Sequence, residues 1–365
     1  MVVFLVQWDT YPYITDDFDF DLLKPSHIAA CYGLSDRFQT TNEVSGILQH
    51  TPLILASANG HKGVVEKLLS RDNVNINSQN RSGRTALFAA SRNGHEAIVK
   101  LLLSRNDIAI NTTTWSGFWG ETPGQTPLLA ASRGGHKGIV KLLLSRNDLN
   151  INSQDEDGRT ALFLASFHGQ EEIVKLLLSR NDIAINTTRR DDSNTPSQTP
   201  LLAASHGGHK GIVKLFLPRN DLDINSQDEK GQTALFLASF HGHEEIVKLL
   251  LSRNDIAINT TIWSGFWDDA SGQTPILAAS RGGHKGIVKL FLSRNDLNIN
   301  SQDEKGQTAL FLASFHGHEA VVKLLLSRTD VDINSRSIYD QTSLSVASLH
   351  GYDRVVGLLR SRDAV

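Results

Sequence analysis

The sequence predicts an all-α solenoid of about ten helix–turn–helix units with protruding hairpin fingers. Three observations predict it: a threonine recurs at a nearly fixed spacing, each interval contains two short helical patterns, and a polar arm follows each second helix. A unit of this size cannot bury its apolar face alone, but stacked neighbours can, so contacts are expected only between adjacent units.

The repeat is set by a threonine that opens "TPL", "TAL" or "TSL". Successive spacings are 34, 41, 34, 39, 34, 41, 34 and 34 residues, so the unit has 34 residues and three units have insertions of 7, 5 and 7. The nine positions are Thr51, Thr85, Thr126, Thr160, Thr199, Thr233, Thr274, Thr308 and Thr342. Close copies lie two units apart, which indicates that the duplicated element is a pair of units.

One unit, residues 125–158, shows how the elements follow from the residues. Thr126 is a good N-cap, and Pro127 suits the first helical position because the N–H it lacks would have no partner there. Gly134 and Gly135 end this short helix. A second helix with a broad apolar stripe is expected from about His136 to Ser145. The arm "NDLNINSQDEDG" alternates in polarity and closes in an Asp-x-x-Gly turn. Small residues should let adjacent units approach closely; they are Ala131, Ala165, Ala204, Ala238, Ala279 and Ala313.

The two ends are expected to be caps with polar outer faces. We predict an N-terminal segment with a degenerate capping unit at 1–50, full units at 51–341 and a C-terminal capping unit at 342–365. The first unit keeps "KPSHIAACYGL", and its second helix is replaced by the more polar stretch 35–46. In the last unit Arg354, Arg360 and Arg362 are expected to face water.

The motif "TPLLAASRGGHKGIVKLLL" resembles the ankyrin repeat, and the resemblance covers about residues 24–365 in nine or ten copies. The His of the family's Thr-Pro-Leu-His motif is here apolar, at Leu129, Phe163, Leu202 and Phe236. Arms such as "SRNDLNINSQD" resemble ankyrin arrays of filamentous fungi, which are tails of NOD-like signalling ATPases or free scaffold proteins. The resemblance implies arms that all project from one side of the stack.

The insertions predict enlarged fingers at 112–124, 187–197 and 260–272, roughly 20 Å apart if neighbouring helices are ~8–10 Å apart. The outer fingers contain four of the five tryptophans, and the middle one contains paired arginines. Two interpretations stay open: the tryptophans pack on their own fingers, or they anchor a partner, as exposed Trp and Arg often do. The candidate partner-binding residues are Trp115, Phe118, Trp119, Arg189, Arg190, Trp263, Phe266 and Trp267.

Other candidates for chemistry have structural explanations. The 14 histidines are mostly periodic, which should spread them along the stack and prevent a metal site. The pairs Glu171–Glu172 and Glu244–Glu245 should begin helices, where negative charge is favourable. Cys31 is expected to be a small buried residue. We find no phosphate-binding loop, CxxC or nucleophile-elbow motif, so we expect neither an enzyme nor a cofactor.

Composition narrows the class further. A net charge of −3 argues against nucleic-acid binding by a basic surface, and a single cysteine excludes an internal disulfide. We find no signal peptide and no stretch of the ~20 apolar residues that span a membrane, so we expect a monomeric soluble protein in the cytoplasm or nucleus.

Three functions remain open. The first is a non-catalytic scaffold or adaptor that binds another protein through the hairpin fingers and the concave helix face. The second is a detached regulatory array that works with a fungal NOD-like ATPase. The third is an enzyme or small-ligand binder with a pocket walled by the Trp-bearing fingers.

Overall fold

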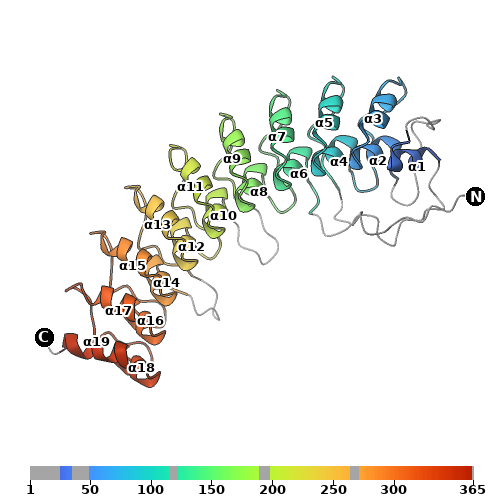
Figure 1. Ribbon diagram of the computed structural model, residues 1–365. Helices are drawn as coiled ribbons and strands as arrows, with labels where there is room; N and C mark the ends of the chain where they lie inside the picture. Colours follow the sequence, from blue (N-terminus) through green and yellow to red (C-terminus); the bar gives the residue numbers. More distant parts are fainter. Residues whose placement is uncertain (1–24, 35–48, 116–121, 189–197, 264–270, 364–365) are drawn as a thin grey trace, which may run out of the picture. The chain divides into compact units, whose positions relative to one another are not determined.

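The computed structural model describes residues 25–34, 49–115, 122–188, 198–263 and 271–363. Within these residues every regular element is an α-helix, and each repeat from α2 onward supplies a first and a second helix (Figure 1). The chain divides into two compact units, residues 1–150 and 151–365, and each is described by itself.

The first unit contains α1 to α7, with first helices α2, α4 and α6 packed on one another. The bounds are α1 Pro25–Tyr32, α2 Pro52–Ala58, α3 Lys62–Leu69, α4 Ala86–Arg92, α5 Glu96–Leu103, α6 Pro127–Arg133 and α7 Lys137–Leu144.

The second unit contains α8 to α19 in the same alternation. Its first helices are α8 Ala161–Phe167, α10 Pro200–His206, α12 Ala234–Phe240, α14 Pro275–Arg281, α16 Ala309–Phe315 and α18 Ser343–Leu349. Its second helices are α9 Glu171–Leu178, α11 Lys210–Phe216, α13 Glu244–Leu251, α15 Lys285–Leu292, α17 Glu319–Leu325 and α19 Asp353–Asp363.

The threonine caps that the sequence predicts are present at eight of the first helices that begin after such a threonine, from α2 to α18. In α6, for example, Thr126 Oγ1 accepts a hydrogen bond from the Leu129 N–H, and Pro127 opens the helix. Thr274 is the exception, and its hydroxyl lies 3.2 Å from the Ser301 hydroxyl of the following arm. Thr199 has the equivalent neighbour and keeps its cap, so the two contacts of this hydroxyl are closely balanced.

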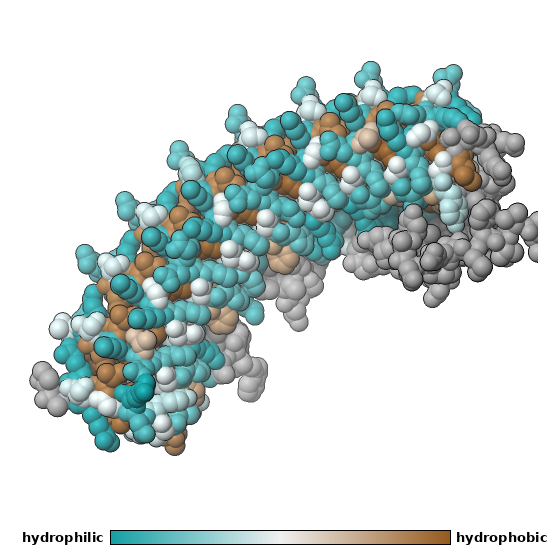
Figure 2. Space-filling model, viewed as in Figure 1, coloured by the Kyte–Doolittle hydropathy of each residue, from teal (hydrophilic) through white to brown (hydrophobic). Residues whose placement is uncertain are grey.

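The core lies between adjacent helix pairs. All six alanines that the sequence singles out are fully buried. In α7, Ile139, Val140 and Leu143 are buried, whereas Leu142 and Leu144 are half-buried. In Figure 2 hydrophobic surface accordingly recurs once per repeat, between hydrophilic side chains, over the row of second helices.

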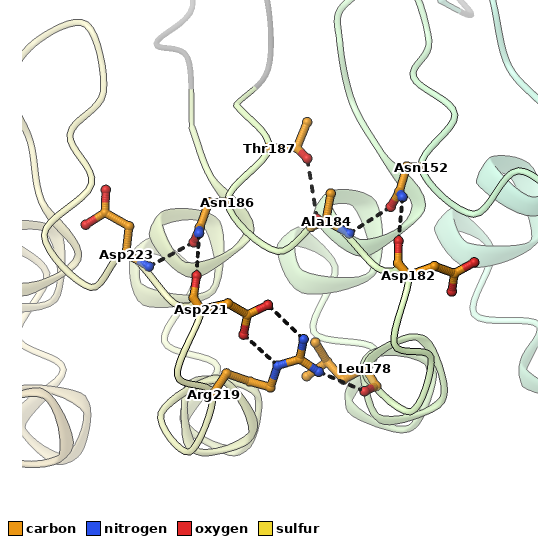
Figure 3. A network of polar contacts seen from close by, with 9 residues as sticks. All are labelled: Asn152, Leu178, Asp182, Ala184, Asn186, Thr187, Arg219, Asp221 and Asp223. Carbon is orange, nitrogen blue, oxygen red and sulfur yellow. Dashed lines mark hydrogen bonds and ion pairs between the residues drawn. The ribbon is translucent and has the colours of Figure 1, made fainter.

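The arms contain no strand among the described residues, although their sequence alternates. Instead, one asparagine per arm holds the next arm (Figure 3). The Asn186 side chain donates to the Asp221 carbonyl at 2.6 Å and accepts from the Asp223 N–H at 3.0 Å. Asn152 binds the Asp182 carbonyl and the Ala184 N–H in the same way.

A guanidinium group adds a second tie between the same repeats. Arg219 makes two hydrogen bonds of 2.9 Å to the Asp221 carboxylate and donates to the Leu178 carbonyl at the end of the preceding second helix (Figure 3). The arms are therefore fixed to their neighbours by side-chain-to-backbone bonds, which satisfy backbone polar groups that a sheet would otherwise pair.

Three expectations need correction or stay outside the described residues. Arg362 is half-buried, since its guanidinium donates to the Arg328 carbonyl, although Arg354 and Arg360 are exposed as expected. Cys31 is only half-buried, and desolvation raises the pKa of its thiol to about 11. The polar stretch expected to replace the second helix of the first repeat falls in 35–48, outside the described residues.

Candidate functional site

The finger bases are built on the same turn that closes every ordinary arm. In the ordinary turn, the Asp228 N–H donates to the Gln232 carbonyl, and the Gly231 N–H donates to the Asp228 carbonyl at 2.9 Å. In the first finger the Thr114 N–H donates to the Gln125 carbonyl, and the Gly124 N–H donates to Thr114 at 2.7 Å. The first insertion therefore falls in the sequence between Trp115 and Gly124, and Thr114 and Gln125 keep the bonds of the ordinary turn.

The third finger repeats this geometry. The Ile262 N–H donates to the Gln273 carbonyl, and the Gly272 N–H donates to Ile262 at 2.7 Å. Gly272 has a φ of 78°, in the left-handed region that favours glycine. A substitution there would also be crowded, because a Cβ would lie 2.6 Å from the Glu304 nitrogen of the next turn.

Each described finger tryptophan has a fixed backbone and an exposed side chain. The Trp115 N–H donates to the Ser82 carbonyl and the Trp263 N–H to the Lys230 carbonyl, both at 3.0 Å. The side chains are nevertheless 60% and 70% exposed, respectively. The Trp263 ring lies against Gly231 of the preceding turn, where a Cβ would be 2.9 Å from its Cδ1.

These contacts support a part of each interpretation of the tryptophans, packing on the protein and exposure to a partner. The Trp263 ring touches the preceding repeat, and most of its surface is open to solvent. The remaining predicted site residues, Phe118, Trp119, Arg189, Arg190, Phe266 and Trp267, lie outside the described residues. Whether the fingertips bind a partner therefore stays a prediction.

In the second unit, the finger base is connected to the exposed face of the first helices. Ile262, next to Trp263, forms a buried cluster with Phe236 and Ala278. The Phe236 ring stacks on Phe240 with centroids 6.1 Å apart. Phe240 ends α12 and is 44% exposed. A continuous line of residues thus runs from an exposed tryptophan to an exposed phenylalanine.

Phe240 belongs to a set of residues that the sequence analysis did not identify. The last residues of five consecutive first helices alternate between aromatic and basic side chains. We call these residues the Phe–basic row; they are Phe167, His206, Phe240, Arg281 and Phe315. In the first unit the same position holds Ala58, Arg92 and Arg133. The signal that could have revealed the row is the alternation "ASF", "ASH", "ASF", "ASR", "ASF" in successive repeats.

The histidines are less spread out than the sequence suggests. His209, His243, His284 and His318 do act structurally, since each ring nitrogen Nε2 bonds a carbonyl of the preceding repeat. Beside the Phe–basic row, however, the ring centroids of His206 and His241 are only 4.5 Å apart. Adjacent repeats bring them together because His206 ends one first helix and His241 caps the next one.

Burial and neighbouring positive charges lower the pKa of two histidines beside the Phe–basic row. The pKa of His241 is lowered, first by desolvation and then by repulsion from His206, His243 and His284. The pKa of His316 is lowered by desolvation, then by Arg281, His318 and His350. Among the described residues no group of three or more metal-ligating side chains is placed to hold an ion.

Carboxylates near the helices have structural roles. Glu171, Glu172, Glu244 and Glu245 occupy the first turns of α9 and α13, as expected. Lys210 pairs with Glu245 of the next second helix at 2.7 Å. Glu244 lies over Gly286 of the following one. In the two kinds of repeat, the second helices therefore begin with residues that contact each other, Lys and Gly in one kind and Glu in the other.

In the described part of the chain, no helix is both long enough and apolar enough to cross a lipid bilayer. A sequence search of curated proteins finds no match. The family model described as ankyrin repeats (3 copies) matches residues 23–114, 118–191, 184–262 and 264–337. This match concerns the repeats alone, so the fungal resemblance and the association with an ATPase stay predictions. The family is typically a non-catalytic module that binds other proteins. Because its model matches most of the sequence in consecutive segments, the chain belongs to the ankyrin-repeat family.

Proposed function

We propose that this protein is a scaffold or adaptor that binds a partner protein through its Trp-bearing fingers and the exposed face of its first helices. The observation that supports this most directly is the pair of exposed tryptophans. Hydrogen bonds from neighbouring turns hold the backbone of both residues, while 60% and 70% of the side chains remain exposed. Tryptophan is enriched among the hot spots of protein interfaces.

The first helices add a second component in residues 151–365. Phe167 and Phe240 are 49% and 44% exposed, although alanine serves at the same position in α2. Stacking of the repeats therefore does not require a large apolar side chain there. Exposed aromatic surface connected to a finger base supports a binding face better than a purely structural role.

The test is a Trp115→Ala/Trp263→Ala variant. Because both side chains are mostly exposed, helicity and the midpoint of thermal unfolding should match the wild type, with a change of about 0.5 kcal/mol or less per site. Affinity capture from native cell extract should lose the specifically bound protein.

Ile338→Ala is the matched control, because Ile338 is 64% exposed, its N–H donates to the Lys305 carbonyl as that of Trp263 does to Lys230, and it belongs to no enlarged finger. This control should capture the same partner as the wild type. Undiminished capture by the double Trp variant would refute the role of the tryptophans and would show that the partner binds elsewhere on the chain.

A further inference from the structure

The Phe–basic row has a regular spacing that a partner must match. Its five residues occupy the same place in α8, α10, α12, α14 and α16, and these first helices pack on one another in order. Packed helices are ~8–10 Å apart. Aromatic and basic side chains therefore alternate at intervals of roughly 10 Å, along residues 167–315 of the second unit.

Each of the first two phenyl rings of the row is supported from below. Phe167 stacks on Phe163 and Phe240 on Phe236, with ring centroids 6.1 Å apart in both pairs. The following histidine, His168 or His241, packs edge-on against the same ring at 5.2 and 5.1 Å. The remaining surface of each ring is a pre-positioned apolar platform.

The surroundings of the row favour acidic over basic ligands. The turns that follow the five first helices read "FHGQ", "HGGH", "FHGH", "RGGH" and "FHGH", without Asp or Glu. The nearest acids in sequence, such as Glu171 and Glu244, lie against Gly211 and Gly286 on the next second helices. One acid does lie near the row: the carboxyl group of Asp303, a buried turn residue, is close to Arg281.

The interval selects the conformation of an extended ligand. A β-strand rises ~3.3 Å per residue and alternates its faces, so two side chains three residues apart point in opposite directions. A polyproline II helix has ~3 residues per turn and rises ~3.1 Å per residue, so every third side chain returns to one face after roughly 9 Å. Aromatic-lined surfaces commonly bind such segments.

We propose that the Phe–basic row docks a polyproline II segment of a partner protein, with apolar and acidic side chains alternating at every third position. The apolar side chains lie on Phe167 and Phe240, and the acidic ones face His206 and Arg281; Phe315, half-buried against the His350 ring, ends the row. This inference rests on the proposed function and specifies the partner for the helix face, independently of the fingers.

Fluorescence anisotropy with the full chain tests the proposal. The probe is a labelled proline-rich peptide with Leu and Glu alternating at every third position. Control peptides have the same composition at every fourth position, or Lys in place of Glu. We expect the first peptide to bind at least about tenfold more tightly than either control, a difference of ~1.4 kcal/mol. Absence of saturable binding, or equal binding of the controls, would overturn the proposal.

Two variants locate the site. Phe167→Ala/Phe240→Ala should weaken binding by about tenfold, as the loss of buried apolar contacts predicts. His206→Glu/Arg281→Glu should lose the Glu peptide and gain the Lys peptide; an unchanged preference would contradict the proposal. If charge reversal unfolds the chain, His206→Ala/Arg281→Ala serves in its place and should reduce the preference for Glu over Lys.

A further comparison separates this proposal from the role of the fingers. Trp115→Ala/Trp263→Ala should bind the peptide as the wild type does, and Ile338→Ala, in the turn of the last arm, should be neutral in the same assay. Loss of peptide binding in the Trp variant would contradict docking on the row alone. Failure of every peptide, together with Trp-dependent capture of a native partner, would refute only the present inference.

Discussion

Buried serines are the residues that most plainly limit the stability of this stack. Eight first helices contain a fully buried serine whose Oγ has no hydrogen-bond partner among the described residues. They are Ser57, Ser91, Ser132, Ser166, Ser205, Ser239, Ser280 and Ser314. A buried hydroxyl without a partner destabilises the folded state, and alanine is the better helix former.

Ser205→Ala should therefore raise the free energy of unfolding by about 1 kcal/mol. The last repeat offers a matched control, because Ser348 stands at the same place in α18 but is exposed. Ser348→Ala should change stability by no more than about 0.5 kcal/mol. The midpoint of urea denaturation measures both, and a lower midpoint for Ser205→Ala would contradict the explanation.

The His50 imidazole makes the first described repeats sensitive to acid. Burial lowers its pKa from 6.5 to about 4, with smaller contributions from Arg84 and His27. Asn80 lies 3.3 Å from His50 Nδ1, in position to donate to the neutral ring. Because the folded state disfavours the protonated ring, its contribution to stability is present above pH 6.5 and is lost as pH falls toward 4.

The loss should amount to roughly 3 kcal/mol across this pH range. Hydrogen exchange in α1 and α2 should therefore accelerate on acidification. In His50→Gln, which keeps an acceptor for Asn80 without a titrating group, the acceleration should be smaller. Equal pH dependence of the two proteins would show that other groups control this end of the chain.

At the scale of elements, contacts between second helices distinguish the two alternating kinds of repeat. One type begins with Lys-Gly and the other with Glu, as in α11 and α13. Lys210 pairs with Glu245 at one junction, and Glu244 lies over Gly286 at the next. A side chain at 286 would occupy the space of the Glu244 carboxylate. Exchanging one repeat for its neighbour would therefore disrupt two junctions.

Two glycines at the same place in the second helix test this account. Gly63 has open space where a Cβ would project, whereas Gly286 faces Glu244. Gly63→Ala should stabilise by about 0.5–1 kcal/mol because alanine is favoured in helices. Gly286→Ala should gain less, since Glu244 must move, and Glu244→Ala should restore part of the gain in the double variant. Equal stabilisation at both sites in urea denaturation would contradict the role of Glu244.

At the scale of the whole molecule, the sequence predicts the repeat architecture but only part of the binding face. The period and the caps follow from local chemistry, as at Thr126 and Pro127, so the helices could be placed to within about one or two residues. The arrangement of Phe240 and His241 depends on contacts with the adjacent repeat, which a periodic pattern does not reveal. For the same reason the exposure of Arg362 was predicted wrongly.

Finger boundaries show the same limit. The insertion after Trp115 looks like a longer arm in sequence, but the residues on either side of it, Thr114 and Gly124, keep the backbone bonds of an ordinary turn. The positions of Trp115 and Trp263 also depend on neighbouring turns, through the Ser82 and Lys230 carbonyls. Composition indicates these tryptophans as candidates, and three-dimensional contacts are needed to show how they are held.

The central claim is that a partner protein covers the exposed tryptophans, and hydroxyl-radical footprinting of the unaltered chain tests it most directly. Oxidation of Trp115 and Trp263 would be followed by mass spectrometry in the purified protein and in native cell extract, with Tyr339, exposed in the turn of the last arm, as the internal reference. The account predicts rapid oxidation of both tryptophans in the purified protein and selective protection relative to Tyr339 in the extract. Equal oxidation of the tryptophans relative to Tyr339 in both samples would contradict it.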